Sequence, residues 1–598
     1  MSSYSEKETE RLPELFGSMV FNEETMRDRL SPACYRAWKQ SVSDGTPLDL
    51  SSANEIAEAM KQWAVEKGAT HYTHWFQPMT GVTAEKHDSF IAPIEGGRVV
   101  MEFSGKELVR GEPDASSFPS GGLRATFEAR GYTAWDPTSF AFIKEKSLCI
   151  PTIFCSYSGH ALDKKTPLLR SMDAVSKAAV RILHLFGDTT TKRVIAQVGP
   201  EQEYFLLDKK MYQEREDLIM TGRTLFGAKP PRGQELEDHY FGAIRPRVQA
   251  YMQDLDNELW KLGVLSKTKH NEVAPAQHEM APVYTDANRA CDQNQITMEI
   301  MKKVADRHGL VCLLHEKPFA GVNGSGKHDN WSLSKDTGEN LFKPGSTPRE
   351  NAQFLLFLTA FIKGVDEYQD MLRATVATPG NDHRLGGNEA PPAVVSIFLG
   401  DELSAVVSSI INDTDYQNAG SRNLAIGVDT MPPIPLDNTD RNRTSPMAFT
   451  GNKFEFRMVG SSLSVSGPNI VLNTMMAEEL GQFADELENS KEENFHRDLN
   501  ALIKRELTAH RRIIFDGNGY DEAWIEEAKR RGLSNKVSAV DALPAYIREH
   551  NIRLFTDHAI YTRDEVFARY NIHVENYAAT IEIEARTMID MLHKEIVC

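Results

Sequence analysis

The chain has 598 residues, a formal net charge of −18, 41% hydrophobic residues and 25% charged residues. This length exceeds one ordinary hydrophobic core, so we expect two to four domains. The balance of apolar and charged residues is typical of a soluble globular protein. The acidic charge, without a basic stripe, argues against a sequence-independent nucleic-acid binder.

The N-terminal segment and the thiols predict a cytoplasmic location. Residues 1–17 are polar and lack the apolar core of a signal peptide. The longest apolar run, residues 354–362, is too short to span a bilayer. The six cysteines form no CxxC pair and no zinc-ligand spacing, which fits a reducing compartment.

The first quarter of the chain changes character near residue 86. Residues 1–85 are polar and mostly helical in pattern, with helical apolar spacing over residues 53–67. Residues 86–155 contain short β-rich runs, such as 98–103 and 123–127, between Gly and Pro turns. This pattern predicts a small antiparallel sheet.

Strands and helices mix from about residue 190. Residues 194–198 and 204–207 predict two short strands, and residues 285–308 predict a long helix that ends before Gly309. Thr347 to Glu350 fits a capping box with Pro348 at the first helical position. A helix is therefore predicted from there to about residue 377.

The remainder predicts a long loop and then helices. Residues 412–446 are rich in Asn, Asp, Pro and Gly, which is typical of a long loop or insertion, and residues 482–506 and 563–596 have helical patterns. We therefore divide the chain into four segments: a helical extension (1–85), a small β domain (86–155), the main domain (156–480) and a C-terminal helical region (481–598).

Glu201 and Glu203 stand two residues apart in a strand-like run. Residues i and i+2 of a strand share a face, roughly 7 Å apart. Two carboxylates on one face repel each other unless water or a cation separates them. Because the flanking residues are apolar, a metal site is favoured over a solvated strand face.

Three further segments carry candidate ligands that are weak when taken singly. Residues 272–279 hold Glu272 and Glu279, although a loop with two glutamates is usually surface. Residues 321–327 read G-x-x-x-x-G-K, almost a P-loop, but His328 follows instead of Ser or Thr, so we reject that reading. Glu455 and Arg457 share one face of a strand, where a cross-strand salt bridge is the alternative.

Together these residues form an inventory for phosphoryl transfer. Five glutamates and one histidine suit two sites for a hard divalent cation, Mg²⁺ or Mn²⁺ rather than zinc. Arginines are natural partners for phosphate and carboxylate oxygens. Metals to neutralise phosphates and arginines to hold the transferring charge are what transfer from ATP to a carboxylate requires.

The order and spelling of these motifs resemble glutamine synthetase. The motifs that carry the resemblance are GPEQEYFLLD, HNEVAPAQHE, KPFAGVNGSGKH, RLGGNEAPP, NRTSP and KFEFR, in the family's order over residues 110–470. The long N-terminal segment, the 412–446 insertion and the helical tail resemble the large, type III branch. The resemblance implies ATP-dependent ligation of ammonia to the γ-carboxylate of glutamate through γ-glutamyl phosphate.

The resemblance also assigns roles to single residues. It implies one cation on Glu203, Glu272 and Glu279, and another on Glu201, His328 and Glu455. It implies that Asn323 and Gly324 take the α-amino side of glutamate, that Arg384 pairs with a glutamate carboxylate, and that Ser332 and Asn330 lie near the nucleotide. It implies that Arg443 and Arg457 face phosphate, and that Glu389 and Asp114, the latter from a neighbouring subunit, form the ammonium site.

The resemblance also implies an architecture, and the sequence departs from the family pattern at some positions. It implies an α+β fold with a β-grasp-like N-terminal domain, a catalytic domain with a curved antiparallel sheet, and two stacked hexameric rings. Glu272 and Glu279 are seven residues apart where the common bacterial type has eight. One further phosphate arginine has no clear equivalent, with Arg422 and Arg441 as candidates. The alternatives left open are a ligase for another amine and a non-catalytic protein on this scaffold.

Overall fold

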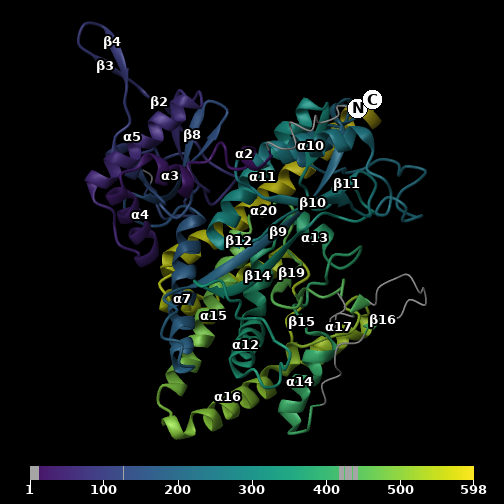
Figure 1. Cartoon of the computed structure of the whole chain (residues 1–598). Coiled ribbons are helices and arrows are strands. Elements are labelled where there is room, and N and C mark those ends of the chain that lie inside the picture. Colours follow the sequence, from purple (N-terminus) through teal and green to yellow (C-terminus); the bar gives the residue numbers. More distant parts are fainter. Residues whose placement is uncertain (1–11, 126, 417–422, 425–433, 436–441, 598) are drawn as a thin grey trace.

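The computed structural model describes residues 12–125, 127–416, 423–424, 434–435 and 442–597. It shows an α+β protein in which a small N-terminal sheet with its own helices lies beside a large sheet covered by helices (Figure 1). The predicted fold class is confirmed. Most of the 412–446 insertion, with Arg422 and Arg441, lies outside the described residues. Among the described helices, none is long and apolar enough to cross a membrane.

The N-terminal sheet begins earlier than residue 86. Its strand order is β2-β1-β8-β6-β5, with β7 (Phe142–Lys144) paired to β8. Strand β1 (His71–Trp75) runs parallel to β8 (Ser147–Ser156), and β2 (His87–Ser89), β6 (Gly131–Trp135) and β5 (Arg110–Gly111) add antiparallel pairs. The sheet is therefore mixed rather than antiparallel. Polar His and Thr residues in β1 hide its alternation from sequence analysis, and the described part of 123–127 is turn, not strand.

Helices of the N-terminal extension cover this sheet. They are α3 (Glu23–Arg29), α4 (Pro32–Asp44) and α5 (Leu50–Glu66), whereas the short α2 (Leu12–Leu15) contacts α10 (Pro246–Lys261) of the main domain. The apolar side chains of α5 at helical spacing, including Ile56, Met60 and Trp63, pack in a core with Leu148 and Ile150 of β8. The helix expected over 53–67 is therefore confirmed, and it joins the extension and the sheet in one unit.

Among the described residues the large sheet has nine strands, seven of which follow one another in the order β10-β11-β9-β14-β19-β18-β15. These are β10 (Ser266–Asn271), β11 (Gln277–Pro282), β9 (Val194–Asp208), β14 (Lys327–Lys335), β19 (Phe454–Phe456), β18 (Met447–Phe449) and β15 (Ile397–Phe398). Short strands β12 (Thr285–Asp286) and β13 (Leu310–Leu313) also pair with β9. All pairs are antiparallel except β15 with β18.

Strand β9 is continuous where the sequence predicted two strands. The GPEQE segment that was expected to separate them lies inside the ladder, because β14 pairs with β9 from Val194 to Gln202. Pro200 lies opposite Asp329 in this ladder, and on its other side it falls between the residues of β9 that pair with β12 (197–198) and with β11 (202–205). The continuous strand holds Glu201 and Glu203 rigidly in the middle of the sheet.

Helices cover one face of this sheet and leave the other for polar residues. Val194, Ala196 and Val198 of β9 pack with Trp331 and Leu333 of β14 in the main core. That core includes α7 (Lys165–Leu185), α12 (Ala352–Thr375) and α15 (Ser466–Leu487). Because side chains alternate along a strand, the residues between these apolar positions point to the opposite face.

Two helix predictions differ from the structure in their boundaries. Helix α12 begins at Ala352 with Asn351 as its N-cap, so the capping box expected at Thr347–Glu350 is wrong, and those residues form a turn. The helix expected over 285–308 is α11 (Ala287–Arg307), and Gly309 follows it with φ 63°. The C-terminal region is helical as expected, with α16 (Phe495–His510) and the long α20 (Arg563–Met591), but the span 482–506 is broken between the end of α15 at Leu487 and the start of α16.

A buried ionic triad joins the N-terminal sheet to the main domain. The Lys165 ammonium at the start of α7 lies 3.0 Å from Asp136 and 2.5 Å from Asp292 of α11. All three side chains are at least 95% buried. Burial lowers the pKa of Lys165, but the charges of the two aspartates outweigh it and raise the pKa above its usual range. The two domains therefore meet in a fixed orientation.

Candidate active site and metal centre

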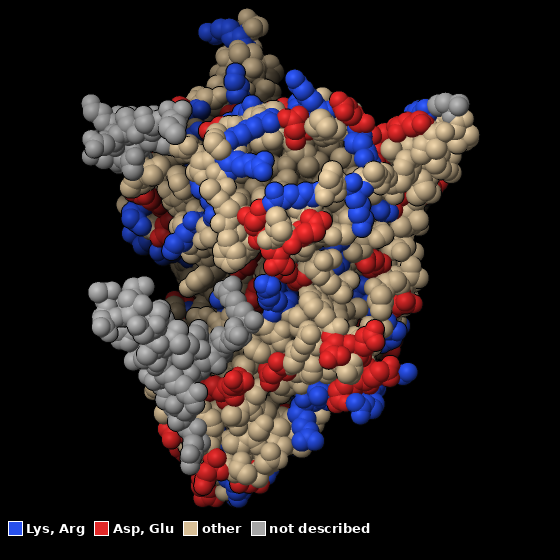
Figure 2. All heavy atoms as spheres, turned by 90° about the vertical axis from the view of Figure 1, so that its right-hand side faces the viewer, with Lys and Arg blue, Asp and Glu red and all other residues tan. Residues whose placement is uncertain are grey.

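Cross-strand register brings the candidate ligands to one face of the large sheet. His328 of β14 lies opposite Glu201 of β9, and Asn330 lies opposite Glu455 of β19. On the other side of β9, Glu203 lies opposite Glu279 of β11. This face is the one that the helices α7, α12 and α15 leave free. On the side of the molecule shown in Figure 2, acidic and basic side chains gather around a central hollow.

The first cluster consists of Glu201, His328 and Glu455. The Nδ1 atom of His328 lies 3.3 Å from Glu201 and 2.9 Å from Glu455, and one ligand atom of each residue lies within 4.8 Å of the others. The Asn330 amide donates to the Glu201 carboxylate at 2.9 Å and to the Gly199 carbonyl at 3.0 Å. The structure thus unites all three residues that the resemblance assigned to one cation, and Asn330 fixes the orientation of Glu201.

Electrostatics of the first cluster favour a positive charge at its centre. Burial lowers the pKa of His328, but hydrogen bonds to Glu201 and Glu455 outweigh burial and raise that pKa to about 10. Burial raises the pKa of Glu201, while its hydrogen bond with His328 brings that pKa below the usual value. The two carboxylates thus favour a positive charge between them, which a divalent cation would supply in a set of oxygen and imidazole donors.

The second cluster consists of His270, Glu272 and Glu279. Their ligand atoms also lie within 4.8 Å of one another, and the imidazole contacts both carboxylates. Burial, together with the charges of Glu203 and Glu279, raises the pKa of Glu272 to about 9. Neighbouring carboxylates repel one another when all of them are ionised, and a bound divalent cation relieves this repulsion. Oxygen donors of this kind are what such cations prefer. Both clusters fit divalent cations.

Glu203 lies between the two clusters. One of its oxygens lies 3.8 Å from Nε2 of His328, and the other accepts a hydrogen bond from the backbone of Gly326 at 2.6 Å. Its backbone pairs with Glu279, but its carboxylate lies outside both sets of mutually close ligand atoms. The resemblance assigned Glu203 to the second cation, and the structure places it where it faces both clusters.

The glycine-rich loop closes one side of the site. The Asn323 side chain accepts from Gln234 at 3.0 Å, and its backbone amide donates to the same side chain at 2.8 Å. The Gly324 carbonyl accepts from Gln277 at 2.8 Å. A Cβ at Gly324 would lie 2.3 Å from the Glu316 carbonyl, so only glycine fits this approach.

Arg384 lies beneath this loop. Its guanidinium is buried and donates to the carbonyls of Arg457, Met458 and Val459, and a Cβ at Gly326 would lie 2.0 Å from its Nη2. Burial lowers its pKa, and the nearby charge of Glu203 opposes that shift. The side chain therefore supports the backbone of the site in this conformation, rather than opening toward a ligand.

Two other arginines pair with catalytic candidates. Arg457 is buried, and its Nη1 lies 3.3 Å from Glu455, while its Nε has no hydrogen-bond partner in the structure. Arg443 is exposed and pairs with Glu389 at 3.2 Å. Glu389 and Asn388 both have left-handed backbone, φ 68° and 52°, which is strained for residues other than glycine. Such strain is typical of functional loops.

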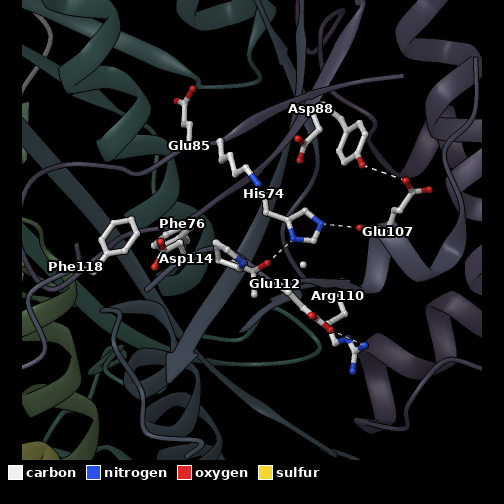
Figure 3. A pocket seen from close by; sticks show the side chains of 14 residues that line it. His74, Phe76, Glu85, Asp88, Glu107, Arg110, Glu112, Asp114 and Phe118 are labelled. Atoms are coloured by element: carbon white, nitrogen blue, oxygen red, sulfur yellow. Dashed lines mark hydrogen bonds and ion pairs between the residues drawn. The ribbon is translucent and has the colours of Figure 1, made fainter. Parts of the chain in front are cut away.

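Ser332 and Asp114 lie away from the clusters. The Ser332 hydroxyl donates to the Asn452 carbonyl at 2.8 Å and accepts from Asn340. Asp114 is exposed at the edge of the N-terminal sheet, where it accepts from the Ser116 amide at 2.8 Å. Asp114 lines a pocket of about 460 Å³ with His74, Phe118 and other residues of that sheet (Figure 3). Within one chain, the pocket that Asp114 lines contains no residue of either metal cluster.

Sequence analysis missed His270 and the loop that covers it. His270 pairs directly with Glu279 across β10 and β11, and the Tyr240 ring meets it edge-on at 5.6 Å between ring centres. His239 contacts the Glu272 carbonyl through Nδ1 at 2.6 Å. One feature of the sequence could have indicated His270. It stands two residues before Glu272, the same spacing as that of Glu201 and Glu203.

Family models match three parts of the chain. Residues 12–171 match the "Glutamine synthetase type III N terminal" family, residues 181–395 the "Glutamine synthetase, catalytic domain" family, and residues 498–598 the "Glutamine synthetase C-terminal domain" family. The first match includes both the helical extension and the mixed sheet, which agrees with their shared core. The second includes both metal clusters except Glu455.

Curated relatives match nearly the whole chain. The chain is 52% identical to the "Type-3 glutamine synthetase" of Dictyostelium discoideum over 98% of its length and 80% of that protein. It is 47% identical to the "Glutamine synthetase" of Bacteroides fragilis (98% and 81%) and also 47% identical to that of Butyrivibrio fibrisolvens (98% and 84%).

Solved structures share the fold at low sequence identity. A Plasmodium falciparum glutamine synthetase matches with a TM-score of 0.58 and 16% identity, over 90% of this chain and 97% of that one. A GmaS/ADP complex matches with a TM-score of 0.54 and 16% identity, over 89% and 99%. These similarities support the sheet and helix arrangement described above.

Proposed function

The chain belongs to the glutamine synthetase family, as a type III member that forms glutamine from glutamate and ammonia with ATP, and we propose that its two carboxylate–imidazole clusters bind the divalent cations of this reaction. The single observation that carries the proposal is the convergence of five strands on one polar face. Strands β10, β11, β9, β14 and β19 each contribute at least one donor side chain to it.

The residues fit a phosphoryl transfer followed by amide formation. Glu201, His328 and Glu455 would hold one cation, and Glu272 and Glu279, with Glu203 beside them, would hold another; Mg²⁺ or Mn²⁺ suits these donors. Such cations neutralise the charge of ATP phosphates when they are bound. Arg457 lies beside Glu455, and its Nε has no hydrogen-bond partner among the residues that the structure describes; there it would stabilise charge on the transferring phosphoryl group. Ser332 and Asn330 would lie near the nucleotide.

The first step joins an oxygen of the glutamate γ-carboxylate to the terminal phosphorus of ATP. The bond from that phosphorus to the bridging oxygen breaks, which yields ADP and γ-glutamyl phosphate. Asn323 and Gly324 would place the α-amino side of glutamate, and Arg384 would support this loop or pair with a glutamate carboxylate after it turns outward. Fixed positioning of the two reactants supplies much of the acceleration.

The second step replaces phosphate by nitrogen. Ammonium loses a proton, its nitrogen attacks the γ-carbonyl carbon, and phosphate leaves with one oxygen of the original carboxylate. Glu389 would accept a proton and close the site, and Arg443, which pairs with it, would hold the loop near phosphate. Asp114 would complete the ammonium site of a neighbouring subunit, because its exposed position leaves it free to face another chain.

This shared site implies an oligomer. We propose a homo-oligomer of two stacked hexameric rings in the cytoplasm, with each active site between two subunits and at least two cations in each. The exposed Asp114 and the separate pocket that contains it support a site of this kind. Closed rings arise when one face of a subunit binds a different face of the next subunit.

Oxygen transfer tests the proposed intermediate. Glutamate labelled with ¹⁸O in its γ-carboxylate should give one labelled oxygen in each phosphate released, as measured by mass spectrometry. Unlabelled phosphate would show that ATP hydrolysis and amide formation are separate, and would contradict the acyl phosphate. A matched reaction with label only in the α-carboxylate should leave phosphate unlabelled.

A further inference from the structure

His270 occupies a position in the second cluster that the carboxylates alone do not explain. It lies directly opposite Glu279 across the β10–β11 ladder, and its two ring nitrogens contact Glu279 and Glu272. The three residues offer ligand atoms within 4.8 Å of one another, as Glu201, His328 and Glu455 do. The two clusters therefore have the same donor set, two carboxylates and one imidazole each.

The surroundings of His270 fix its ring in an orientation suited to a ligand. Nδ1 lies 2.8 Å from the backbone carbonyl of Asn271, which can only accept a hydrogen bond, so this nitrogen carries the proton. The unprotonated lone pair of the neutral ring is then on Nε2, the atom that faces Glu279. Histidines that bind metals are commonly oriented in this way, by donating their other nitrogen to a carbonyl or carboxylate.

The covering loop restricts the ring further. Tyr240 meets the His270 ring edge-on, with 5.6 Å between ring centres, and the Asn271 side chain donates to the carbonyls of His239 and Gly242 at 3.2 and 3.1 Å. These contacts tie the 239–242 segment to the end of β10. A ring held from two sides loses little conformational freedom when it binds an ion.

We propose that His270 is a protein ligand of the second cation, together with Glu272 and Glu279, and that its imidazole shifts this site toward Mn²⁺ over Mg²⁺. This inference rests on the proposed function, since it takes the cluster to be a cation site. Mg²⁺ prefers oxygen donors and keeps its water, whereas a transition-metal ion such as Mn²⁺ accepts an imidazole nitrogen more readily. The proposed place of Glu203 beside Glu272 and Glu279 is unchanged, since its second oxygen faces His328.

Direct metal binding tests the proposal on the full-length protein. Metal-free wild type, His270→Gln and His308→Gln would be titrated with Mn²⁺, and free Mn²⁺ would be measured by electron paramagnetic resonance. His308 is a suitable control because it is a partly buried histidine at the end of α11 that pairs with Asp254 at 2.7 Å. Each protein would also be titrated with Mg²⁺ in competition with Mn²⁺.

The expected result is two Mn²⁺ ions per chain in wild type and His308→Gln. In His270→Gln, one of the two dissociation constants should rise about 10- to 100-fold for Mn²⁺ and less for Mg²⁺. His270→Asp, which keeps a ligand atom without imidazole, should bind two ions with a lower preference for Mn²⁺, and it decides the matter if the Gln variant does not fold.

Two results would overturn the inference, and they are distinguishable. Unchanged Mn²⁺ affinity and stoichiometry in both His270 variants would show that His270 only forms an ion pair with Glu279, and would leave the proposed function intact. Absence of Mn²⁺ and Mg²⁺ binding in wild type would remove both the inference and the proposed cation sites.

Discussion

His328 lies directly opposite Glu201 across β14 and β9, and its Nδ1 lies 3.3 Å from the Glu201 carboxylate. The pairing comes from the ladder that runs from Val194 to Gln202 and from Lys327 to Lys335, so the sheet itself sets the distance. Sites built on strands are positioned more exactly than sites on loops. The geometry of the first cluster is therefore a property of the fold and not of local side-chain choice.

Replacement of His328 tests the first cluster. We expect His328→Gln to reduce glutamine formation about 100-fold or more, because the site loses its imidazole donor. The measurement is steady-state glutamine formation over a range of Mg²⁺ and Mn²⁺ concentrations. His308 is a partly buried histidine that pairs with Asp254 away from the site, so His308→Gln should retain wild-type rates. Equal rates for both variants would remove His328 from the cation site.

Local alternation indicated that Glu201 and Glu455 lie on polar strand faces, whereas the grouping of Glu201, His328 and Glu455 around one cation came from the resemblance to glutamine synthetase. Glu201 and Glu203, or Glu455 and Arg457, share a face through strand geometry alone. His270 was missed because its relation to Glu279 depends on the β10–β11 register, which no local pattern specifies. In the same way, β9 was split because Gly199 and Pro200 suggest a turn, whereas pairing with β14 keeps the strand extended.

The start of the N-terminal sheet also depends on strand pairing that local sequence does not specify. Strand β1 carries two histidines and two aromatic residues, and it belongs to the sheet because it runs parallel to β8, more than seventy residues later. The expected capping box at Thr347 was outcompeted by Asn351, whose side chain accepts from the Phe354 amide at 3.0 Å. Strand pairing thus decides that β1 belongs to the sheet, and the choice between two capping residues decides where α12 begins; local propensity settles neither.

Subunit mixing tests the placement of Asp114. Asp114→Asn and Glu201→Gln should each be nearly inactive alone, since each removes one half of a shared site. After joint dissociation and reassembly in equal amounts, random mixing should restore up to about a quarter of the sites, because some then combine both intact halves. Glutamine formation before and after mixing is the measurement. No recovery in a verified mixed oligomer would place Asp114 in the active site of its own chain or outside it.

The buried triad around Lys165 is expected to matter for stability. Lys165→Met leaves Asp136 and Asp292 buried without a cation, which should lower the free energy of unfolding by about 3 kcal/mol. Denaturant unfolding followed by tryptophan fluorescence would measure this change. The triple variant with Asp136→Asn and Asp292→Asn should recover part of the loss.

A surface pair serves as the control for the triad. Arg563 pairs with Glu549 at 2.9 Å with more than half of each side chain exposed. Arg563→Met should therefore cost less than about 1 kcal/mol. Similar losses for Lys165→Met and Arg563→Met would contradict the role assigned to the triad.

The pH dependence of stability should reflect Asp163. Burial raises the pKa of this carboxyl to about 6, although hydrogen bonds from Thr166 oppose the shift. Because the folded pKa lies above the unfolded value, the contribution of Asp163 to stability is fully present below about pH 4 and is lost as pH rises through 6. The loss between pH 5 and pH 7.5 should be about 1 kcal/mol.

Asp163→Asn removes this titration. The difference in unfolding free energy between the variant and wild type should therefore shift in favour of the variant as pH rises from 5 to 7.5. Denaturant unfolding at the two pH values gives the measurement, with Asp173→Asn, at an exposed position of α7, as the control. A difference that does not change with pH would show that Asp163 is ionised in the fold at pH 5.

The most direct test of the central claim is phosphate release by the purified protein with ATP, Mg²⁺ and glutamate, with and without ammonium, measured together with glutamine. The account predicts that release depends on ammonium and matches glutamine one to one, and that Glu201→Gln abolishes both. Release that depends on another amine, with no glutamine formed from ammonium, would contradict it.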